Sequence, residues 1–125
     1  MLADYPAVTT IPATDLERAK KWYSDTLGFK PVVDEPEYVE FNAAGGTRFG
    51  LFPTRAAAGA GHTVLSFEVD DVEKVVQELR GRGVIFEEYD SPNLKTVDGI
   101  ATIEGFKGGW FKDSEGNVLG VSQRT

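Results

Sequence analysis

The sequence predicts an α+β fold in which two βαβββ modules follow one another along the chain. A short β-rich stretch, a helix-capping signal and an amphipathic helix occur twice, and Glu17 of the first capping signal is 56 residues before Glu73 of the second. The strand pairs that follow also occur twice, 70 residues apart. Their order and duplication predict an internal repeat in which each copy packs one helix on one mixed sheet.

The first module contains one strand, one helix and three further strands. Residues 6–13 are β-rich and mostly apolar, which indicates a strand. Thr14 and Glu17 match a capping box with Thr14 as the N-cap, and the helix is expected to run to about Gly28. The three later strands are expected at residues 29–33, 37–42 and 47–52, with Pro36 and residues 44–46 in the turns between them.

The second module has the same order and is 14 residues longer. Asp70 and Glu73 match a second capping box with Asp70 as the N-cap, and the helix ends near Gly81 and Gly83. Its strands are expected at residues 63–69, 84–89, 110–112 and 117–123. The extra length is expected at residues 91–106, as a lid, a surface loop or a contact between two copies of the chain.

The repeat defines the division of the chain. Residues 1–53 are assigned to the first module, residues 62–125 to the second, and residues 54–61 to a linker of small residues. The two hairpins align through three pairs of residues: Phe41 with Phe111, Gly46 with Gly116, and Gly50 with Gly120.

Composition excludes several classes of function. The formal net charge of −7 argues against nucleic acid and anionic membranes as partners and favours neutral or cationic ones. The chain has no cysteine and one histidine, so disulfides, cysteine-ligated metals and sites with two imidazoles from one chain are excluded. No apolar run approaches the length of a membrane span, and no signal peptide is recognisable, so we expect a cytoplasmic protein.

Three segments carry a resemblance to a known family. They are TDLERAKKWYSDTLGF at residues 14–29, VDDVEKVVQELRGRGV at residues 69–84, and WFKDSEGNVLGV at residues 110–121. Together they resemble the vicinal oxygen chelate superfamily, which contains glyoxalase I, bleomycin resistance proteins and extradiol dioxygenases. The resemblance covers nearly the whole chain and implies that the sheets curl into an open, barrel-like cleft with the helices outside.

Metal-using members of that superfamily take ligands from the first and last strand of each module. The resemblance carries these positions onto Val8, Gly50, Val64 and Gly120, none of which has a donor side chain. A divalent metal needs several fixed N, O or S ligands, so we expect no metal and no other cofactor.

Strand alternation predicts which side chains point into the cleft. The candidate ligand-binding residues are Val8, Thr10, Glu40, Arg48, Gly50, Phe52, His62, Val64, Ser66, Trp110 and Gly120. The two glycines either leave volume for a ligand or relieve crowding between strands. Phe52 and Trp110 are either aromatic walls for a planar ligand or ordinary packing residues.

The candidate catalytic residues are Glu40 and His62. Glu40 either forms an ion pair with Arg48, or binds a cation or acts as a general base. His62 is either an exposed residue at the start of a strand or a hydrogen-bonding group or base at the cleft mouth.

These observations and the resemblance lead to three hypotheses about function. The first is a homodimeric protein that binds or sequesters a small planar or cationic molecule, as bleomycin resistance proteins do. The second is a metal-independent lyase or isomerase of the superfamily that uses Glu40 or His62 for proton transfer. The third is a metal enzyme whose carboxylate ligands are displaced from the usual positions.

Overall fold

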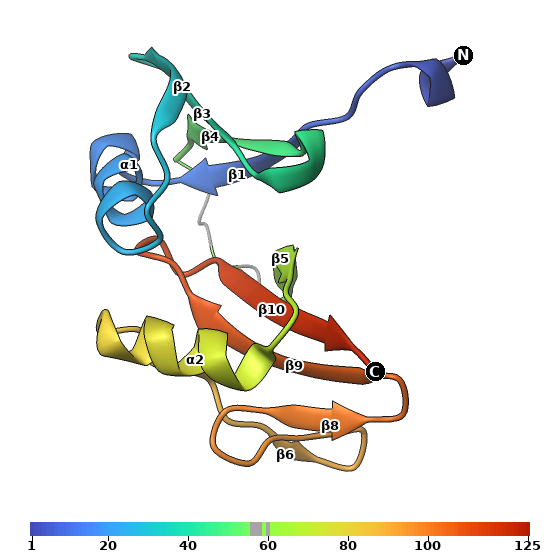
Figure 1. The fold of residues 1–125 in the computed structure, drawn as a ribbon. Helices are drawn as coiled ribbons and strands as arrows, with labels where there is room; N and C mark the ends of the chain where they lie inside the picture. Colours follow the sequence, from blue (N-terminus) through green and yellow to red (C-terminus); the bar gives the residue numbers. More distant parts are fainter. Residues whose placement is uncertain (56–58, 60) are drawn as a thin grey trace. The chain divides into compact units, whose positions relative to one another are not determined.

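The chain divides into two compact units, Met1–Ala58 and Gly59–Thr125. The computed structural model describes residues 1–55, 59 and 61–125, so part of the expected linker at residues 54–61 lies outside the described residues. Each unit packs one helix against one four-stranded mixed sheet (Figure 1). The predicted α+β class with a repeated unit is confirmed. Neither helix is long and apolar enough to cross a membrane.

The first unit is built around an aromatic core between its helix and sheet. Its regular elements are η1 (Leu2–Asp4), β1 (Thr9–Ala13), α1 (Leu16–Asp25), β2 (Pro31–Glu35), β3 (Tyr38–Asn42), η2 (Ala44–Gly46) and β4 (Arg48–Pro53). The strand order is β1-β4-β3-β2, with β1 parallel to β4 and the other pairs antiparallel. Tyr23 of α1 packs on Phe41 and Phe49 with ring centroids 5.8 and 5.6 Å away. All three side chains are buried, so alternate residues of β3 and β4 face away from α1.

The second unit repeats this arrangement. Its elements are β5 (Thr63–Glu68), α2 (Val72–Gly81), β6 (Asp90–Ser91), β7 (Leu94–Lys95), β8 (Ala101–Ile103), β9 (Phe106–Lys112) and β10 (Val118–Arg124). The four-stranded sheet has the order β5-β10-β9-β8, with β5 parallel to β10, and β6 and β7 form a separate small hairpin. The rings of Phe86 and Phe111, 5.3 Å apart, belong to its core.

The strand registers confirm the hairpin alignment. Glu40 pairs with Gly50 across β3 and β4, and Trp110 pairs with Gly120 across β9 and β10. Both residues of the second pair are 70 positions after their counterparts in the first. Glu40 and Trp110 therefore occupy equivalent places in the two sheets, each beside a glycine.

One predicted strand is wrong. Residues 84–89 form no regular strand, and only Phe86 makes an isolated bridge, to Phe111. The edge position belongs to β8, which lies inside the stretch of residues 91–106 expected to be irregular. The side chain of Glu88 explains the change of path, because it accepts hydrogen bonds from Thr96 Oγ1 (2.6 Å) and Gly99 N (2.8 Å) and ties the chain into a loop. The residues that make the second module longer than the first therefore lie before β8, the edge strand of the second sheet.

Both predicted N-caps are wrong by one residue. The side chain of Asp15 accepts a hydrogen bond from Arg18 N, and that of Asp71 accepts one from Lys74 N, at 3.0 and 3.2 Å. Thr14 and Asp70 precede these caps. The predicted capping boxes are absent. Glu17 and Glu73 instead place a negative charge in the first turn of each helix, where its interaction with the helix dipole stabilises the helix.

We predict that Asp15→Ala and Asp71→Ala each lower the free energy of unfolding by about 1 kcal/mol, because each leaves a first-turn N–H without its acceptor. Thr14→Ala and Asp70→Ala are the matched controls and should cost less than half as much. Urea unfolding measures all four variants. An equal loss for Thr14→Ala and Asp15→Ala would contradict the observed capping of α1.

Candidate ligand-binding site

A polar cluster lies on the face of the first sheet that points away from α1. Tyr38 Oη donates a hydrogen bond of 2.7 Å to Glu40 Oε1, and Arg48 Nη1 is 3.6 Å from Glu40 Oε2. The side chain of Glu40 is 12% exposed and that of Arg48 is 37% exposed. The expected ion pair between Glu40 and Arg48 is confirmed, and it engages one carboxylate oxygen while Tyr38 engages the other.

The phenol of Tyr38 is held in its protonated form. The hydrogen bond to Glu40, burial and the negative charge of Glu40 together raise the pKa of Tyr38 to about 12, although Arg48 acts in the opposite direction. At neutral pH this phenol is therefore a fixed donor to the carboxylate. Sequence analysis missed Tyr38, although its position two residues before Glu40 on the same strand places it on the same face.

We predict that Tyr38 titrates near pH 12 and that Glu40→Gln lowers its pKa, because the variant removes the charge and weakens the hydrogen bond. A free phenol has a pKa of about 10, so this group contributes stability below about pH 10 that is lost as the pH rises through the folded value. NMR of ring-labelled tyrosine measures the titration. Asp34→Asn is the control, since Asp34 pairs with Lys20. An unchanged Tyr38 titration in Glu40→Gln would contradict the assigned cause.

Gly50 is closely covered by Tyr38. A Cβ atom at position 50 would overlap the Tyr38 ring and its hydroxyl. Of the two interpretations of this glycine, the structure favours relief of crowding, because the space beside the glycine is occupied by a side chain of the neighbouring strand.

An aromatic cluster lies on the face of the second sheet that points away from α2. Trp110 lies 5.7 Å from Tyr89 in an edge-to-face arrangement and 6.2 Å from Phe106 in a nearly stacked one, measured between ring centroids. All three rings are partly exposed. Phe111, the next residue of β9, points to the buried side, as strand alternation requires.

The glycines around Trp110 are also covered. A Cβ at Gly108 would meet the ring of Phe106, and one at Gly120 would lie 3.1 Å from Ser66 Oγ and 3.4 Å from the indole of Trp110. Phe106, four residues earlier on the same strand, is therefore a side-chain neighbour of Trp110. The absence of side chains at Gly108 and Gly120 leaves room for the rings of Phe106 and Trp110.

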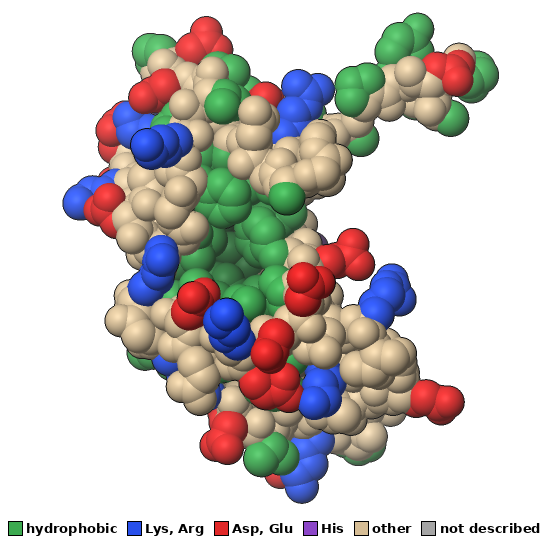
Figure 2. Space-filling model, viewed as in Figure 1, with side chains coloured by type: hydrophobic (Ala, Val, Ile, Leu, Met, Phe, Trp, Pro, Cys, Tyr) green, Lys and Arg blue, Asp and Glu red, His purple; other side chains and the backbone are tan. Residues whose placement is uncertain are grey.

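Charged groups near this cluster are paired. Lys112 Nζ lies 3.5 Å from Glu87 Oε1, and Glu87 N donates to the carbonyl oxygen of Trp110. Burial, with a smaller contribution from Glu87, raises the pKa of Tyr89 and keeps its phenol protonated at neutral pH. Figure 2 shows acidic and basic side chains intermixed on one face of the second unit.

Two of the remaining candidate residues pair with the candidate glycines, Thr10 with Gly50 across β1 and β4, and Ser66 with Gly120 across β5 and β10. Val8 precedes β1 and is partly exposed, Thr10 is exposed on β1, and Phe52 is half-buried on β4. Val64 and Ser66 lie on β5. His62 is exposed just before β5, with Nδ1 3.4 Å from its neighbour's carbonyl oxygen, as expected for a residue at the start of a strand.

The model of the Glyoxalase/Bleomycin resistance protein/Dioxygenase superfamily matches residues 6–121. The chain belongs to this superfamily. No match was found among curated proteins.

Solved structures of superfamily members are similar over almost the whole chain. A member from Sphaerobacter thermophilus is 26% identical, with 96% of this chain and 97% of its own covered and a TM-score of 0.71. A glyoxalase/bleomycin resistance protein from Streptomyces sp. CB03234 is 25% identical, with 95% and 100% covered and a TM-score of 0.67. TnmS3, an antibiotic binding protein from the same strain, is 23% identical, with 97% and 96% covered and a TM-score of 0.69, a likeness of fold alone.

The residues at the superfamily's metal-ligand positions do not fit a metal ion. Gly50 is covered by the Tyr38 ring and Gly120 lies against Trp110 and Ser66, while Val8 and Val64 offer only hydrocarbon. Within the described residues, no three or more His, Cys, Asp or Glu side chains form a group that could hold a metal ion. The four positions therefore provide apolar and aromatic packing contacts and no side-chain atom that could bind a metal.

Proposed function

We propose that this protein binds a small planar molecule on the face of the second sheet opposite α2, without the metal of the metal-using superfamily members. The observation that carries the proposal is the partly exposed cluster of Trp110, Tyr89 and Phe106. Flat aromatic groups gain from offset or edge-to-face contact with such rings. TnmS3 is described as an antibiotic binding protein, and we extend a binding role of this kind to the present chain as part of the proposal.

The ligand's shape is expected to matter more than its charge. The net charge of −7 favours cations at long range. Next to the rings, however, Glu87 is paired with Lys112. In the first unit, Glu40 is engaged by both Tyr38 and Arg48. Glu87 and Glu40 are thus already partnered, which favours a planar ligand that need not be a cation.

The alternative of a metal-independent lyase or isomerase receives less support. A general base needs an accessible acceptor within reach of a substrate proton. Both oxygens of Glu40 are engaged within the protein, and exposed His62 is placed before the strand. Glu40 therefore suits a structural role better than proton transfer.

The oligomeric state and the cellular location of the protein are also part of the proposal. We propose a cytoplasmic homodimer, since twofold dimers are the commonest assembly of soluble proteins and an aromatic face is a common place for a ligand to be enclosed. Sedimentation of the purified protein at several concentrations tests the dimer, and a monomer throughout would contradict it.

We predict that Trp110→Ala weakens binding of a planar probe by about tenfold or more, because removal of a stacking aromatic costs about 1–3 kcal/mol. Acridone and proflavine are suitable probes, since both have three fused rings and only proflavine carries a positive charge. Isothermal calorimetry measures both affinities. Trp22→Phe, on α1, is the matched control and should bind as the unchanged protein does.

The two probes separate shape from charge. Similar affinity for both supports selection by shape, whereas binding of proflavine alone, lost at high salt, would favour a cation site. No binding of either probe, or equal binding by the Trp110→Ala variant, would contradict the proposal.

A further inference from the structure

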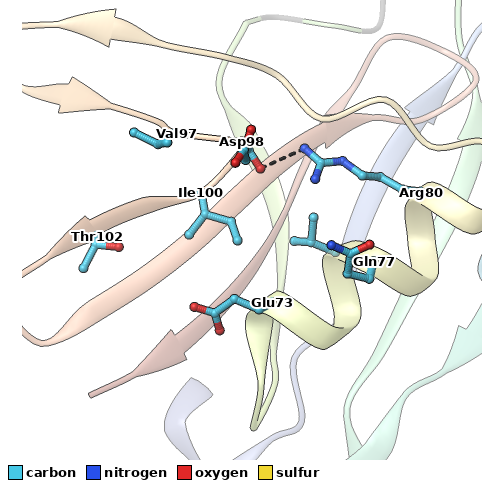
Figure 3. Close-up of a pocket in the computed structure, with 8 residues that line it drawn as sticks. Glu73, Gln77, Arg80, Val97, Asp98, Ile100 and Thr102 are labelled. Carbon is cyan, nitrogen blue, oxygen red and sulfur yellow. Dashed lines mark hydrogen bonds between the residues drawn. The ribbon is translucent and has the colours of Figure 1, made fainter.

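A cavity of about 300 Å³ lies between α2 and the segment that leads into β8 (Figure 3). One side is a single face of the helix, formed by Glu73, Val76, Gln77 and Arg80, and the other is formed by Val97, Asp98, Ile100 and Thr102. The cavity lies on the helix side of the second sheet, whereas the Trp110 cluster lies on the opposite face. It is therefore separate from the site proposed above.

The outer wall of this cavity is a tight and well-anchored turn. Asp98 and Gly99 both have positive φ values, 54° and 78°, and hydrogen bonds of 2.9 and 3.1 Å run both ways between Val97 and Ile100. This is the pattern of a two-residue hairpin turn, for which Asp-Gly is a favoured sequence. Arg80 Nη2 donates to the carbonyl oxygen of Asp98 at 2.8 Å and holds the turn against α2. Such a wall makes the cavity largely preformed, as small-molecule sites usually are.

The two ends of the cavity differ in charge. Glu73 lies in the first turn of α2, and its Oε1 accepts a hydrogen bond of 2.7 Å from Lys107 Nζ. Lys107 and the local hydrogen bonds lower the pKa of Glu73 and keep it ionised. Arg80 lies in the last turn, seven residues later, which corresponds to a rise of about 10 Å along the helix. Figure 3 shows Gln77 between them on the same helix face.

Hydrogen-bond donors are available at the end of the cavity where Arg80 lies. The guanidinium of Arg80 is positioned by the Asp98 carbonyl and by the Phe86 ring, whose centroid lies 5.6 Å from Cζ. A guanidinium has five N–H groups, so most of its donors are left for a ligand. The amide of Gln77, one turn earlier on the same face, adds further donors.

We propose that this cavity binds a small zwitterion, with its carboxylate at Arg80 and Gln77 and its ammonium group at Glu73. Ile100, which is partly exposed, then contacts the aliphatic part between the two charges, whereas Val76 is fully buried beneath the cavity. The volume equals that of about ten water molecules, which suits a ligand of about ten non-hydrogen atoms.

The surrounding charges favour a zwitterion over a simple ion. Asp98 lies beside the Arg80 end and disfavours a lone anion, and Lys107 lies beside Glu73 and disfavours a lone cation. These four side chains sum to zero formal charge, and Glu88, whose pKa is lowered by hydrogen bonds from Thr96 and Gly99 and also by the charge of Arg80, adds a negative charge near Arg80. A neutral ligand with separated charges places each of its charges beside a group of opposite sign.

The test compares three ligands of similar length: 6-aminohexanoate, hexanoate and hexylamine. Titrations followed by ¹⁵N NMR should shift the Gln77 side-chain amide, the Arg80 Nε–H and the Gly99 amide with 6-aminohexanoate. We expect 6-aminohexanoate to bind about fivefold more tightly than either single-charge ligand, the upper range for a partly exposed ion pair.

The variants are chosen to leave the wall of the cavity intact. Glu73→Gln should weaken 6-aminohexanoate by about fivefold and leave hexanoate unchanged. Glu78→Gln is the matched control, because Glu78 is an exposed residue of the same helix that does not line the cavity. Thermal unfolding of each variant checks that it is folded.

Several results would overturn the proposal. They are the absence of any shift with 6-aminohexanoate, equal affinity for hexanoate or hexylamine, and an equal effect of Glu73→Gln and Glu78→Gln. Because the Trp110 cluster is on the other face of the sheet, the planar-probe experiment stands or fails independently of these results.

Discussion

Replacing Gly50 by valine is expected to lower the free energy of unfolding by about 3 kcal/mol. A side chain at this position would overlap the ring of Tyr38, which lies directly over the glycine. Displacement of that ring would also break the hydrogen bond to Glu40, whose side chain is 12% exposed. Overpacking and the loss of a partner for a largely buried carboxylate both act in the same direction. Urea unfolding measures the change.

The cause can be isolated by a double-mutant cycle. In a Tyr38→Ala background the ring that covers Gly50 is absent, so the same valine substitution should cost less than half as much. Gly81→Ala is the control for glycine replacement in general, since Gly81 ends α2, has open space around it and should gain up to about 1 kcal/mol from helix propensity. An equal cost of Gly50→Val with and without Tyr38 would show that the ring contact is not responsible.

The parts of the fold that could be predicted are those fixed by a repeated pattern. Strand alternation assigns Arg48, Gly50 and Phe52 to one face of β4 and leaves Phe49 and Leu51 for the helix side, where both are buried. The equivalence of the Glu40–Gly50 and Trp110–Gly120 pairs follows from the alignment of the hairpins. Periodicity is a property of many residues at once, so single exceptions do not disturb it.

Features that depend on one residue or on a long-range hydrogen bond could not be predicted. Thr14 and Asp15 are both good N-caps, and their order in the sequence does not show which one begins the helix. The path of residues 84–100 depends on Glu88, which binds Thr96 and Gly99 through its side chain. Such contacts form only once the sheet has brought the segments together, and they leave no periodic signal.

In the candidate site, too, some features could be predicted from the sequence and others could not. Glu40 and Arg48 could be paired from the sequence because they lie on neighbouring strands of one sheet. The role of Gly50 could not be predicted, because a glycine in a strand is compatible both with vacant volume and with a covering side chain. Tyr38 decides between them by its ring position, which depends on a rotamer and not on the sequence pattern.

The second large effect is expected at the turn between β9 and β10, which is organised around the carboxylate of Asp113. Its Oδ1 accepts hydrogen bonds from Glu115 N (2.8 Å) and Asn117 N (2.9 Å), and its Oδ2 accepts one from Asn117 Nδ2 (2.9 Å). Asp113 is 6% exposed and Asn117 is 1% exposed, so water cannot readily replace the lost acceptor. Asp113→Ala should therefore lower the free energy of unfolding by about 3 kcal/mol, and Asp113→Asn, which keeps one acceptor oxygen, by about half of that.

This network also connects the turn to the start of the second unit, because Asn117 Oδ1 accepts a hydrogen bond from Gly59 N at 3.2 Å. Loss of the Asp113 carboxylate removes one hydrogen-bond partner of the Asn117 side chain, so amide exchange should accelerate at residue 117 and at Gly59 together. Ser114→Ala is the control in the same turn and should change stability by about 0.5 kcal/mol or less, since Ser114 is only partly buried. If Asp113→Ala cost no more than Ser114→Ala, or if exchange at Gly59 were unchanged, then the turn would be held by backbone pairing of β9 and β10 alone, and the buried carboxylate would contribute little to it.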